Sequence, residues 1–431
     1  MKASSIALRK IIFLLLLAVL ILPAIQSKLN LFKVKPLQGA ITNAPDTSFS
    51  VHAWFSGNYQ EEKTKYLNDV FGFRNLFVRI NNQVAFNLFD YALANGVIIG
   101  KNNYLYEESH IEAYCGLDFI GEDSISQRMT KLKYIQDTLA KLNKTLLLVF
   151  APGKGYFYPE YIPDNYKKTS GPTNYDDYLK FAKSLGINYI DFNKYFIDNK
   201  NKSKYPLYPK YGNHWSVYGM WQAADSMINY IEAARKISMS HIYWKTIKMG
   251  MPDDGDADIE NGMNLLFKLK SDSLAYPDIQ FQSDSGKTKP SSIIISDSFY
   301  WGMFVSDISK IYSDSHFWYY NNEIYPDGLT TKQINLKDQI AKHDVIIIIS
   351  TNATLPTLGW GFIEKAYNMF TGHHATSPAE ERAQIIDIAN GIKANPDWMI
   401  QMEADAKKGG ISVDSAVMQN AKWVLDHTYK N

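Results

Sequence analysis

A serine and a histidine far apart in the chain are of the types that could work together in nucleophilic catalysis. Ser298 closely follows the apolar run at 293–295, which is typical of a buried strand ending at the carboxyl edge of a sheet, where open α/β folds place their sites. His214 directly precedes a segment of helical periodicity that starts at Ser216. Imidazole titrates in the right range to take the proton of a serine hydroxyl and so activate it. We therefore expect Ser298 to be the nucleophile and His214 the base.

Each of these two residues also has a simpler interpretation. Ser298 ends a Ser-Asp-Ser segment, and these residue types are favoured at strand ends because their side chains bond to the local backbone. His214 could pack beside Trp215 without any role in chemistry. Both interpretations stay open for each residue alone, and the presence of both residues in one chain favours chemistry.

Short aliphatic or β-branched runs alternate with helical stretches, which is the pattern of parallel strands buried on both faces. The runs lie at 97–99, 145–150, 188–191, 292–295 and 345–349. The pattern predicts an α/β fold whose strand ends position the candidate residues.

The chain divides into four segments by pattern. Residues 1–28 read as a signal anchor or signal peptide, 29–92 as a lead-in and helical segment, 93–375 as an α/β domain, and 376–431 as C-terminal helices. Periodicity is weakest at 239–290, which we interpret as an insertion in the α/β domain.

The composition excludes several classes of protein. With 46% hydrophobic residues, the chain can bury a core and is not disordered. The 45 Lys and Arg nearly balance the 44 Asp and Glu, which argues against nucleic acid as a partner. The single cysteine, Cys115, forbids an intramolecular disulfide.

The N-terminus predicts export. Lys2, Arg9 and Lys10 precede an uncharged apolar run at 11–25, so a positive flank stays in the cytoplasm and the rest of the chain lies outside it. No clean small-residue cleavage site follows, and we favour an uncleaved membrane anchor over a removed signal peptide. The expected location is the periplasmic side of the inner membrane, or the periplasm if the signal is cleaved.

Several short motifs follow one another in a fixed order. They are Phe71-Gly72-Phe73-Arg74, Val97-Ile98-Ile99-Gly100-Lys101, Ala151-Pro152-Gly153-Lys154, Tyr158-Pro159-Glu160-Tyr161-Ile162-Pro163, His214-Trp215-Ser216 with Gly219, and Ser296-Asp297-Ser298-Phe299. This ordered set resembles the alginate O-acetyltransferases of the AlgX/AlgJ type.

The resemblance implies an SGNH hydrolase-like three-layer α/β/α sandwich with a mainly parallel sheet. It implies that Ser298 is transiently acetylated and that His214 activates it. It also implies action outside the cytoplasm on a secreted polysaccharide, with acetyl groups supplied by a membrane-bound O-acyltransferase.

The chain departs from the family beside the histidine. An aspartate commonly stands two residues before it, but here that position is Gly212. Losing the carboxylate of a serine triad can cost roughly 10⁴ in turnover, so another group must orient His214 or activity is feeble. Asn213, Asp191 or a backbone carbonyl are candidates. Asn352 could donate to an oxyanion or merely end its strand.

Other residues could bind the substrate. Lys154 and Tyr156, near a strand end, could hold a carboxylate or hydroxyl, or could simply cap and pack. Trp215, Tyr300 and Trp301 could hold a glycan, since aromatic rings stack on sugars.

We expect no cofactor and no metal. The acidic run at 253–258 resembles a Ca²⁺ loop but lacks the glutamate at position 12. His373 and His374 are adjacent, which is poor geometry for one metal on a helix.

Two further functions remain open. An acetylesterase would use water in place of the sugar hydroxyl on the same acyl-enzyme. A polysaccharide-binding or assembly protein with a decayed site is the third possibility, and the missing aspartate motivates it.

Overall fold

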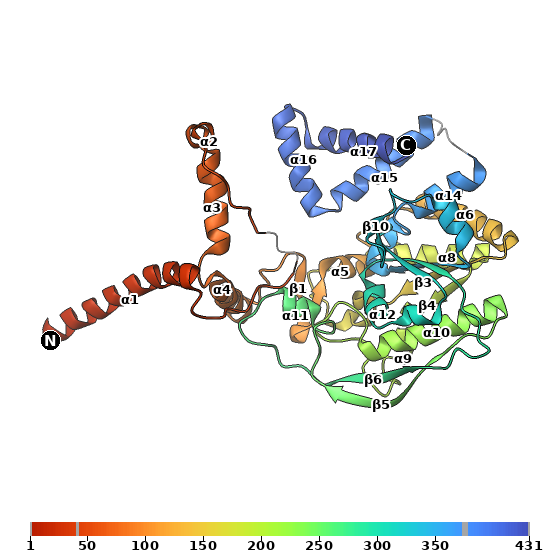
Figure 1. The fold of residues 1–431 in the computed structure, drawn as a ribbon, viewed down its shortest axis with the longest axis horizontal. Helices are drawn as coiled ribbons and strands as arrows, with labels where there is room; N and C mark the ends of the chain where they lie inside the picture. Colours follow the sequence, from red (N-terminus) through yellow and green to blue (C-terminus); the bar gives the residue numbers. More distant parts are fainter. Residues whose placement is uncertain (1, 40–42, 373–377, 430–431) are drawn as a thin grey trace.

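The computed structural model describes residues 2–39, 43–372 and 378–429 (Figure 1). A seven-stranded sheet forms its centre, in the order β10-β9-β8-β7-β11-β3-β4. The five strands from β8 to β4 are parallel, and β9 and β10 add an antiparallel edge. The strands are β3 (Thr145–Ala151), β4 (Tyr189–Asp191), β7 (Ser292–Ser296), β8 (Ser315–Tyr319), β9 (Glu323–Tyr325), β10 (Leu329–Thr330) and β11 (Val345–Thr351). The predicted mainly parallel α/β sheet is confirmed.

One predicted strand lies outside this sheet. The run at 97–99 forms β1 (Val97–Ile99), which pairs antiparallel with β2 (Leu105–Glu107) in a separate two-stranded sheet. Its inclusion among the parallel strands was wrong, because a short apolar run does not specify its pairing partner.

Helices cover both faces of the sheet, so the predicted three-layer sandwich is confirmed. Along β3, Leu147 and Val149 join the core on one face, and Leu146 and Leu148 join the core on the other, as the alternation of a doubly covered strand requires. The first face carries α9 (Phe192–Asn199), α10 (Val217–Arg235) and α12 (Trp301–Val305). The second carries α6 (Glu122–Lys141), α8 (Asn174–Leu185) and α14 (Phe362–Thr371).

Shorter helices connect these elements around the sheet. They are α5 (Glu108–Cys115), α7 (Lys154–Phe157), α13 (Leu336–Lys342), η1 (Lys101–Asn103), η2 (Pro159–Tyr161), η3 (Ser298–Tyr300), η4 (Ile308–Ile311) and η5 (Asn352–Thr357). The helix η3 matters most for the site, since it begins at Ser298 directly after β7.

The segment interpreted as an insertion forms a two-stranded ribbon. The strands β5 (Ile242–Gly250) and β6 (Leu274–Phe281) pair antiparallel, and the short helix α11 (Asp258–Gly262) lies between them in sequence. The ribbon runs beside α10 at the lower edge of the view, while α11 lies near β1 (Figure 1).

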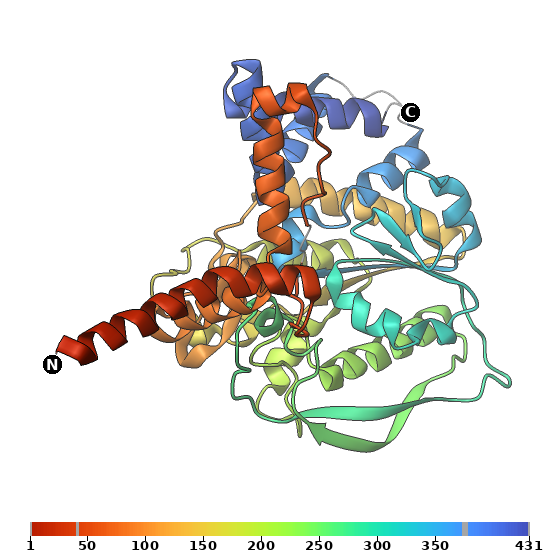
Figure 2. The ribbon, with the colours of Figure 1, turned by 60° about the vertical axis from the view of Figure 1, so that its left-hand side comes forward.

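The N-terminal helix α1 (Lys2–Leu29) projects away from the α/β domain (Figures 1 and 2). Within the described residues, the part from Leu8 to Leu29 is the one helix long and apolar enough to cross a membrane. This is compatible with the predicted anchor or signal. The helices α2 (Val51–Ser56), α3 (Asn58–Val70) and α4 (Arg74–Phe89) follow it.

Three C-terminal helices complete the chain, as expected. They are α15 (Pro378–Lys393), α16 (Pro396–Gly409) and α17 (Val413–Tyr429), and they share a small apolar core of their own. The predicted boundary at 375–376, like His373 and His374, lies outside the described residues.

Candidate active site

Ser298 stands where β7 ends at the carboxyl edge of the sheet. All five residues of β7 are buried, so the strand fixes the position at which the chain turns. The side chain of Asp297 accepts hydrogen bonds from the backbone N–H of Phe299 at 3.0 Å and of Thr351 at 3.0 Å. It also accepts one from the Thr354 hydroxyl at 2.7 Å. These bonds tie the turn that carries Ser298 to the end of the neighbouring strand β11.

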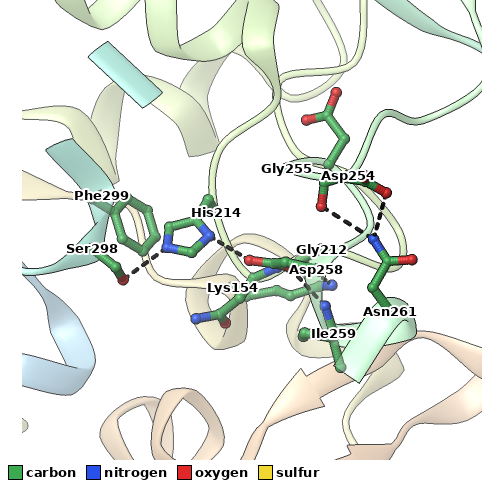
Figure 3. Close-up of polar contacts among 12 residues, drawn as sticks. Lys154, Gly212, His214, Asp254, Gly255, Asp258, Ile259, Asn261, Ser298 and Phe299 are labelled. Atoms are coloured by element: carbon green, nitrogen blue, oxygen red, sulfur yellow. Dashed lines mark hydrogen bonds and ion pairs between the residues drawn. The ribbon is translucent and has the colours of Figure 1, made fainter. Parts of the chain in front are cut away.

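His214 is held at the start of α10 by contacts on both sides of it in sequence. The Ser216 hydroxyl caps the helix by accepting from the Gly219 N–H at 3.0 Å. The Tyr208 hydroxyl donates to the backbone oxygen of Asn213 at 2.5 Å. Nε2 of His214 lies 2.8 Å from Oγ of Ser298 (Figure 3). Folding thus places the imidazole within hydrogen-bond distance of a hydroxyl 84 positions further along.

The partner of the other imidazole nitrogen is Asp258, at the start of α11. Its Oδ2 lies 2.5 Å from Nδ1 of His214 (Figure 3). Its Oδ1 accepts from the backbone N–H of Asn213 at 2.7 Å and of Ile259 at 2.8 Å. Both carboxylate oxygens are therefore engaged, and the aspartate is fixed relative to the loop that carries the histidine.

Gly212 makes room for this acidic segment. A Cβ at position 212 would lie 2.5 Å from the backbone oxygen of Asp256 and 2.8 Å from its carbonyl carbon. Any side chain at 212 would therefore displace the segment that supplies Asp258. The absence of an acid before His214 and the presence of Asp258 are thus two aspects of one arrangement.

The charges of the pair support each other. Burial opposes the charged imidazolium of His214, but the charge and hydrogen bond of Asp258 outweigh it and raise the pKa of His214. Burial likewise opposes the Asp258 carboxylate, and His214 and the Asn213 N–H outweigh it and lower the pKa of Asp258. An ionised Asp258 keeps the imidazole proton on Nδ1, which leaves the Nε2 lone pair facing the Ser298 hydroxyl.

The structure does not place Asp191 or the side chain of Asn213 beside the imidazole. Asp191 accepts from the Tyr175 hydroxyl at 2.8 Å and caps α9 through the Lys194 N–H at 2.9 Å. Asn213 contributes only backbone groups to the contacts around His214. Asp191 as the replacement acid was therefore wrong, because its carboxylate serves the start of α9.

Asn352 follows β11 at the same edge as Ser298. It is 2% exposed, and neither atom of its carboxamide has a hydrogen-bond partner among the described residues. The side chain lies against Gly153, where a Cβ would come 2.4 Å from Oδ1 of Asn352. A buried polar group without a partner is costly, so the unpartnered carboxamide of Asn352 at this edge calls for an explanation.

Lys154 faces the protein interior instead of a substrate. It is fully buried, and its Nζ donates to the backbone oxygens of Lys210 at 2.9 Å and Gly212 at 2.5 Å. Burial lowers the pKa of Lys154 to about 7, although Asp258 opposes this effect. As a substrate ligand Lys154 was wrong, because both bonds hold the loop before His214. The Tyr156 hydroxyl donates to Thr173 at 2.6 Å, which fits the capping and packing alternative.

The aromatic residues expected to hold a glycan lie mostly in the core. Trp215 is 4% exposed and packs against Phe299, and Tyr300 is 1% exposed. Neither presents a free ring face. Their assignment to glycan binding was therefore wrong, because both rings are packed in the core. Trp301 is half-buried, and its ring contacts several aromatic side chains around β8 and β9.

Comparison with known proteins gives the class of the domain. Residues 97–251 match the model of an SGNH hydrolase-like domain. The matching model is described as that of the acetyltransferase AlgX, so the resemblance drawn from the motifs is confirmed over this segment. The match includes His214 and ends before Asp258 and Ser298. No curated protein matches the chain.

Several solved structures show low similarity to this chain. The O-acetyltransferase domain of Pseudomonas putida AlgJ is 15% identical, with a TM-score of 0.43, over 64% of this chain and 99% of that one. Pseudomonas aeruginosa AlgX is 12% identical, with a TM-score of 0.33, over 59% of this chain and 55% of that one. Bacillus cereus PatB1 with a sulfonyl adduct is 12% identical, with a TM-score of 0.37, over 55% and 91%.

The role of Asp258 was not predicted from the sequence. Its acidic run was considered only as a Ca²⁺ loop. The missing signal was topological, because Asp258 lies 44 positions from His214 in a segment without clear periodicity. The one available hint was the glycine at 212.

Proposed function

We propose that this chain is a serine-dependent O-acetyltransferase that modifies hydroxyl groups of a secreted polysaccharide. The proposal rests on the continuous line of contacts from Ser298 through His214 to Asp258, with distances of 2.8 and 2.5 Å. A nucleophile, a base and an orienting carboxylate in this order form the arrangement of serine acyl transfer. The match to the acetyltransferase AlgX domain supports the acetyl group as the one transferred.

In the first half-reaction, Nε2 of His214 takes the proton from the Ser298 hydroxyl, and Oγ attacks the carbonyl carbon of an acetyl donor. The bond from that carbon to the donor's leaving group breaks, and His214 returns the proton to the leaving group. In the second, His214 takes the proton of a sugar hydroxyl, whose oxygen attacks acetyl-Ser298. The ester bond to Oγ breaks, the proton returns to Oγ, and the sugar leaves acetylated.

Asn352 is the side chain we assign to the developing oxyanion. Its Nδ2 has no partner among the described residues, and Thr351 directly before it is bonded to Asp297 beside Ser298. A donor already oriented in a buried site stabilises the oxyanion without reorganisation.

Tyr320 is the aromatic residue we assign to the acceptor sugar. It follows β8 at the carboxyl edge, and its backbone N–H donates to the oxygen of Ser296 at 2.9 Å. The residue is 38% exposed, and its ring meets Trp360 edge-on at 5.3 Å between centroids. An exposed ring beside the nucleophile offers the stacking surface that Trp215 and Tyr300 do not.

The N-terminal helix would hold the domain on the periplasmic side of the inner membrane. An anchor there keeps Ser298 near a membrane-bound O-acyltransferase, the acetyl donor expected for this class. The decayed binding protein was motivated by the missing aspartate, and Asp258 removes that motivation.

The test uses cells that acetylate their polysaccharide through this chain. Replacing the gene with Ser298→Ala should remove polysaccharide acetyl groups and labelling of the protein by a fluorophosphonate probe. Ser296→Ala is the matched control, since Ser296 is buried two residues earlier and its hydroxyl has no partner among the described residues. Unchanged acetylation in Ser298→Ala would refute the proposal. Purified protein with an acetyl donor, with and without an oligosaccharide, distinguishes transfer from the hydrolysis of an esterase.

A further inference from the structure

A cluster of two histidines and two aspartates lies at the opposite edge of the sheet from Ser298. Asp314 directly precedes β8, His316 is the second residue of β8, and His343 stands two residues before β11. The strands β8 and β11 flank β7, so the cluster lies near the amino end of β7. Ser298 follows the carboxyl end of the same strand, roughly 20 Å away at 3.3 Å per residue.

The side chains converge closely. Nε2 of His316 lies 3.1 Å from Oδ1 of Asp314, and Nε2 of His343 lies 3.5 Å from Oδ2 of the same aspartate. One ligand atom from each of the three residues lies within 4.8 Å of the others. The outer nitrogens are also engaged, since Nδ1 of His316 is 3.0 Å from Oδ2 of Asp327 and Nδ1 of His343 is 2.7 Å from the backbone oxygen of Gln339.

The two imidazoles of the cluster, when neutral, have too few N–H donors for these four nitrogen–oxygen contacts. All four ring nitrogens face oxygen acceptors, three of them carboxylate oxygens. A neutral imidazole carries one N–H, so two neutral rings supply two protons for four nitrogens. With both rings neutral, two of the four nitrogens therefore face an oxygen with a lone pair, next to two carboxylates.

Protonating both rings would be costly at His343. This side chain is 1% exposed, and burying a charged group away from water is costly. In the neutral ring, Nδ1 carries the proton and donates it in the hydrogen bond to the Gln339 oxygen. Nε2 therefore presents a lone pair to Asp314. That Nε2 has no hydrogen-bond partner among the described residues. A cation between this lone pair and the Asp314 carboxylate would give both of them a partner.

We propose that Asp314, His316 and His343 bind one divalent transition-metal ion of the Zn²⁺ class. Two ligands at about 2.0–2.1 Å from a tetrahedral ion are roughly 3.3 Å apart. The two imidazole nitrogens lie 3.1 and 3.5 Å from the two oxygens of Asp314, and a set with one ligand atom from each residue converges within 4.8 Å. Two imidazoles and one carboxylate suit Zn²⁺ and its neighbours in the series better than Mg²⁺ or Ca²⁺. Asp327 and the Gln339 oxygen orient the rings from outside, as partners of metal-bound histidines do.

The ion would act as a brace. It joins the start of β8 to the start of β11 across β7, the strand that positions Ser298, and has no contact with the candidate active site. The inference therefore does not depend on the proposed function. It replaces the expectation that the chain holds no metal.

The test measures Zn²⁺ binding by the purified full-length protein in detergent. After chelation and dialysis against a limited concentration of free Zn²⁺, the wild type should retain one ion per chain. Zn²⁺ should also raise its melting temperature, because an ion that binds only the folded state stabilises it. Co²⁺ in the same site should give the visible absorption of a four- or five-coordinate ion.

Two variants at partly exposed positions test the ligands without emptying the core. Asp314→Asn and His316→Gln should each weaken Zn²⁺ binding at least tenfold and abolish the thermal shift. His241→Gln is the matched control: Nε2 of His241 lies 3.0 Å from Oε2 of Glu232, outside the cluster. The His241→Gln variant should bind Zn²⁺ as the wild type does. Absence of binding, or binding that persists in both variants, would overturn the proposal. The second result would direct attention to His373 and His374.

Discussion

The α/β sheet domain and the ribbon segment at 239–290 contribute differently to one site. The sheet domain supplies Ser298 at the end of β7 and His214 at the start of α10, both fixed by buried periodic elements. The ribbon segment supplies Asp258 from a loop between two strands that lie outside the sheet. The nucleophile and base thus follow from the architecture of the fold, whereas the orienting acid comes from a peripheral segment.

Removing the base should have the largest effect. His214→Ala leaves Ser298 without a proton acceptor, and acetyl transfer should fall by roughly 10⁶-fold, the scale for a lost triad base. The measurement is kcat with a small acetyl ester and an oligosaccharide acceptor. His241→Gln serves as a control and should keep wild-type turnover. A loss below tenfold would mean that the sheet domain does not supply the base.

Removing the acid tests the contribution of the ribbon segment. Asp258→Asn should lower kcat by roughly 10⁴, because the imidazole loses the group that fixes its tautomer. Asp254→Asn changes an exposed acid in the same loop that bonds to Asn261 at 3.1 Å, and it should stay within about twofold of wild type. Equal activity of the two variants would show that the segment does not orient His214.

The pH dependence of activity tests the effect of the Asp258 charge on His214. The Asp258 carboxylate raises the pKa of His214, and the base works only when neutral. Activity of the wild type should therefore fall as pH decreases through a value above the usual pKa of about 6.5. In Asp258→Asn the residual activity should persist to lower pH, because burial then dominates. If the activity of both proteins falls at the same pH, the Asp258 carboxylate does not raise the pKa of His214.

Moving the acidic segment without removing the acid should have a smaller effect. In Gly212→Ala the new Cβ would meet the Asp256 oxygen at 2.5 Å, so the loop must shift. A displacement of about 1 Å can cost roughly 10²-fold in rate, and we expect a loss of this order in kcat. Gly262→Ala is the control in α11, where a Cβ meets nothing within 4 Å. Equal kcat for both variants would show that position 212 does not set the position of Asp258.

The smallest effect on activity should come from Lys154→Met. Two buried carbonyl oxygens, of Lys210 and Gly212, lose their donor, which should lower the free energy of unfolding by about 2 kcal/mol. The measurement is thermal unfolding, with fluorophosphonate labelling falling only several-fold. An unchanged melting temperature would show that this lysine does not hold the loop.

The sequence was sufficient to predict the strands that form continuous apolar runs and the helix with a regular apolar stripe. Four of the five predicted runs form strands of the parallel sheet, and α10 begins next to the predicted helix start at Ser216. The edge of the sheet at which Ser298 lies follows directly from those runs. A strand pattern does not name its partner, however, so β1 was placed in the wrong sheet.

Tertiary contacts explain what the sequence could not give. Trp215 and Tyr300 are aromatic, as sugar-binding residues often are, but their burial depends on helices distant in sequence. Asp258 reaches His214 because a loop folds back over Gly212, and no local pattern encodes that path. The two imidazoles at 316 and 343 likewise meet only because their strands flank β7.

Mass spectrometry of the acyl-enzyme tests the central claim most directly. The purified protein is mixed with an acetyl donor in the absence of any sugar acceptor, quenched in acid and digested. We predict one acetyl group on the peptide that contains Ser298, and its loss when an oligosaccharide acceptor is added before the quench. Acetyl transfer that proceeds with no acetyl group on Ser298, or that persists in Ser298→Ala, would contradict the account.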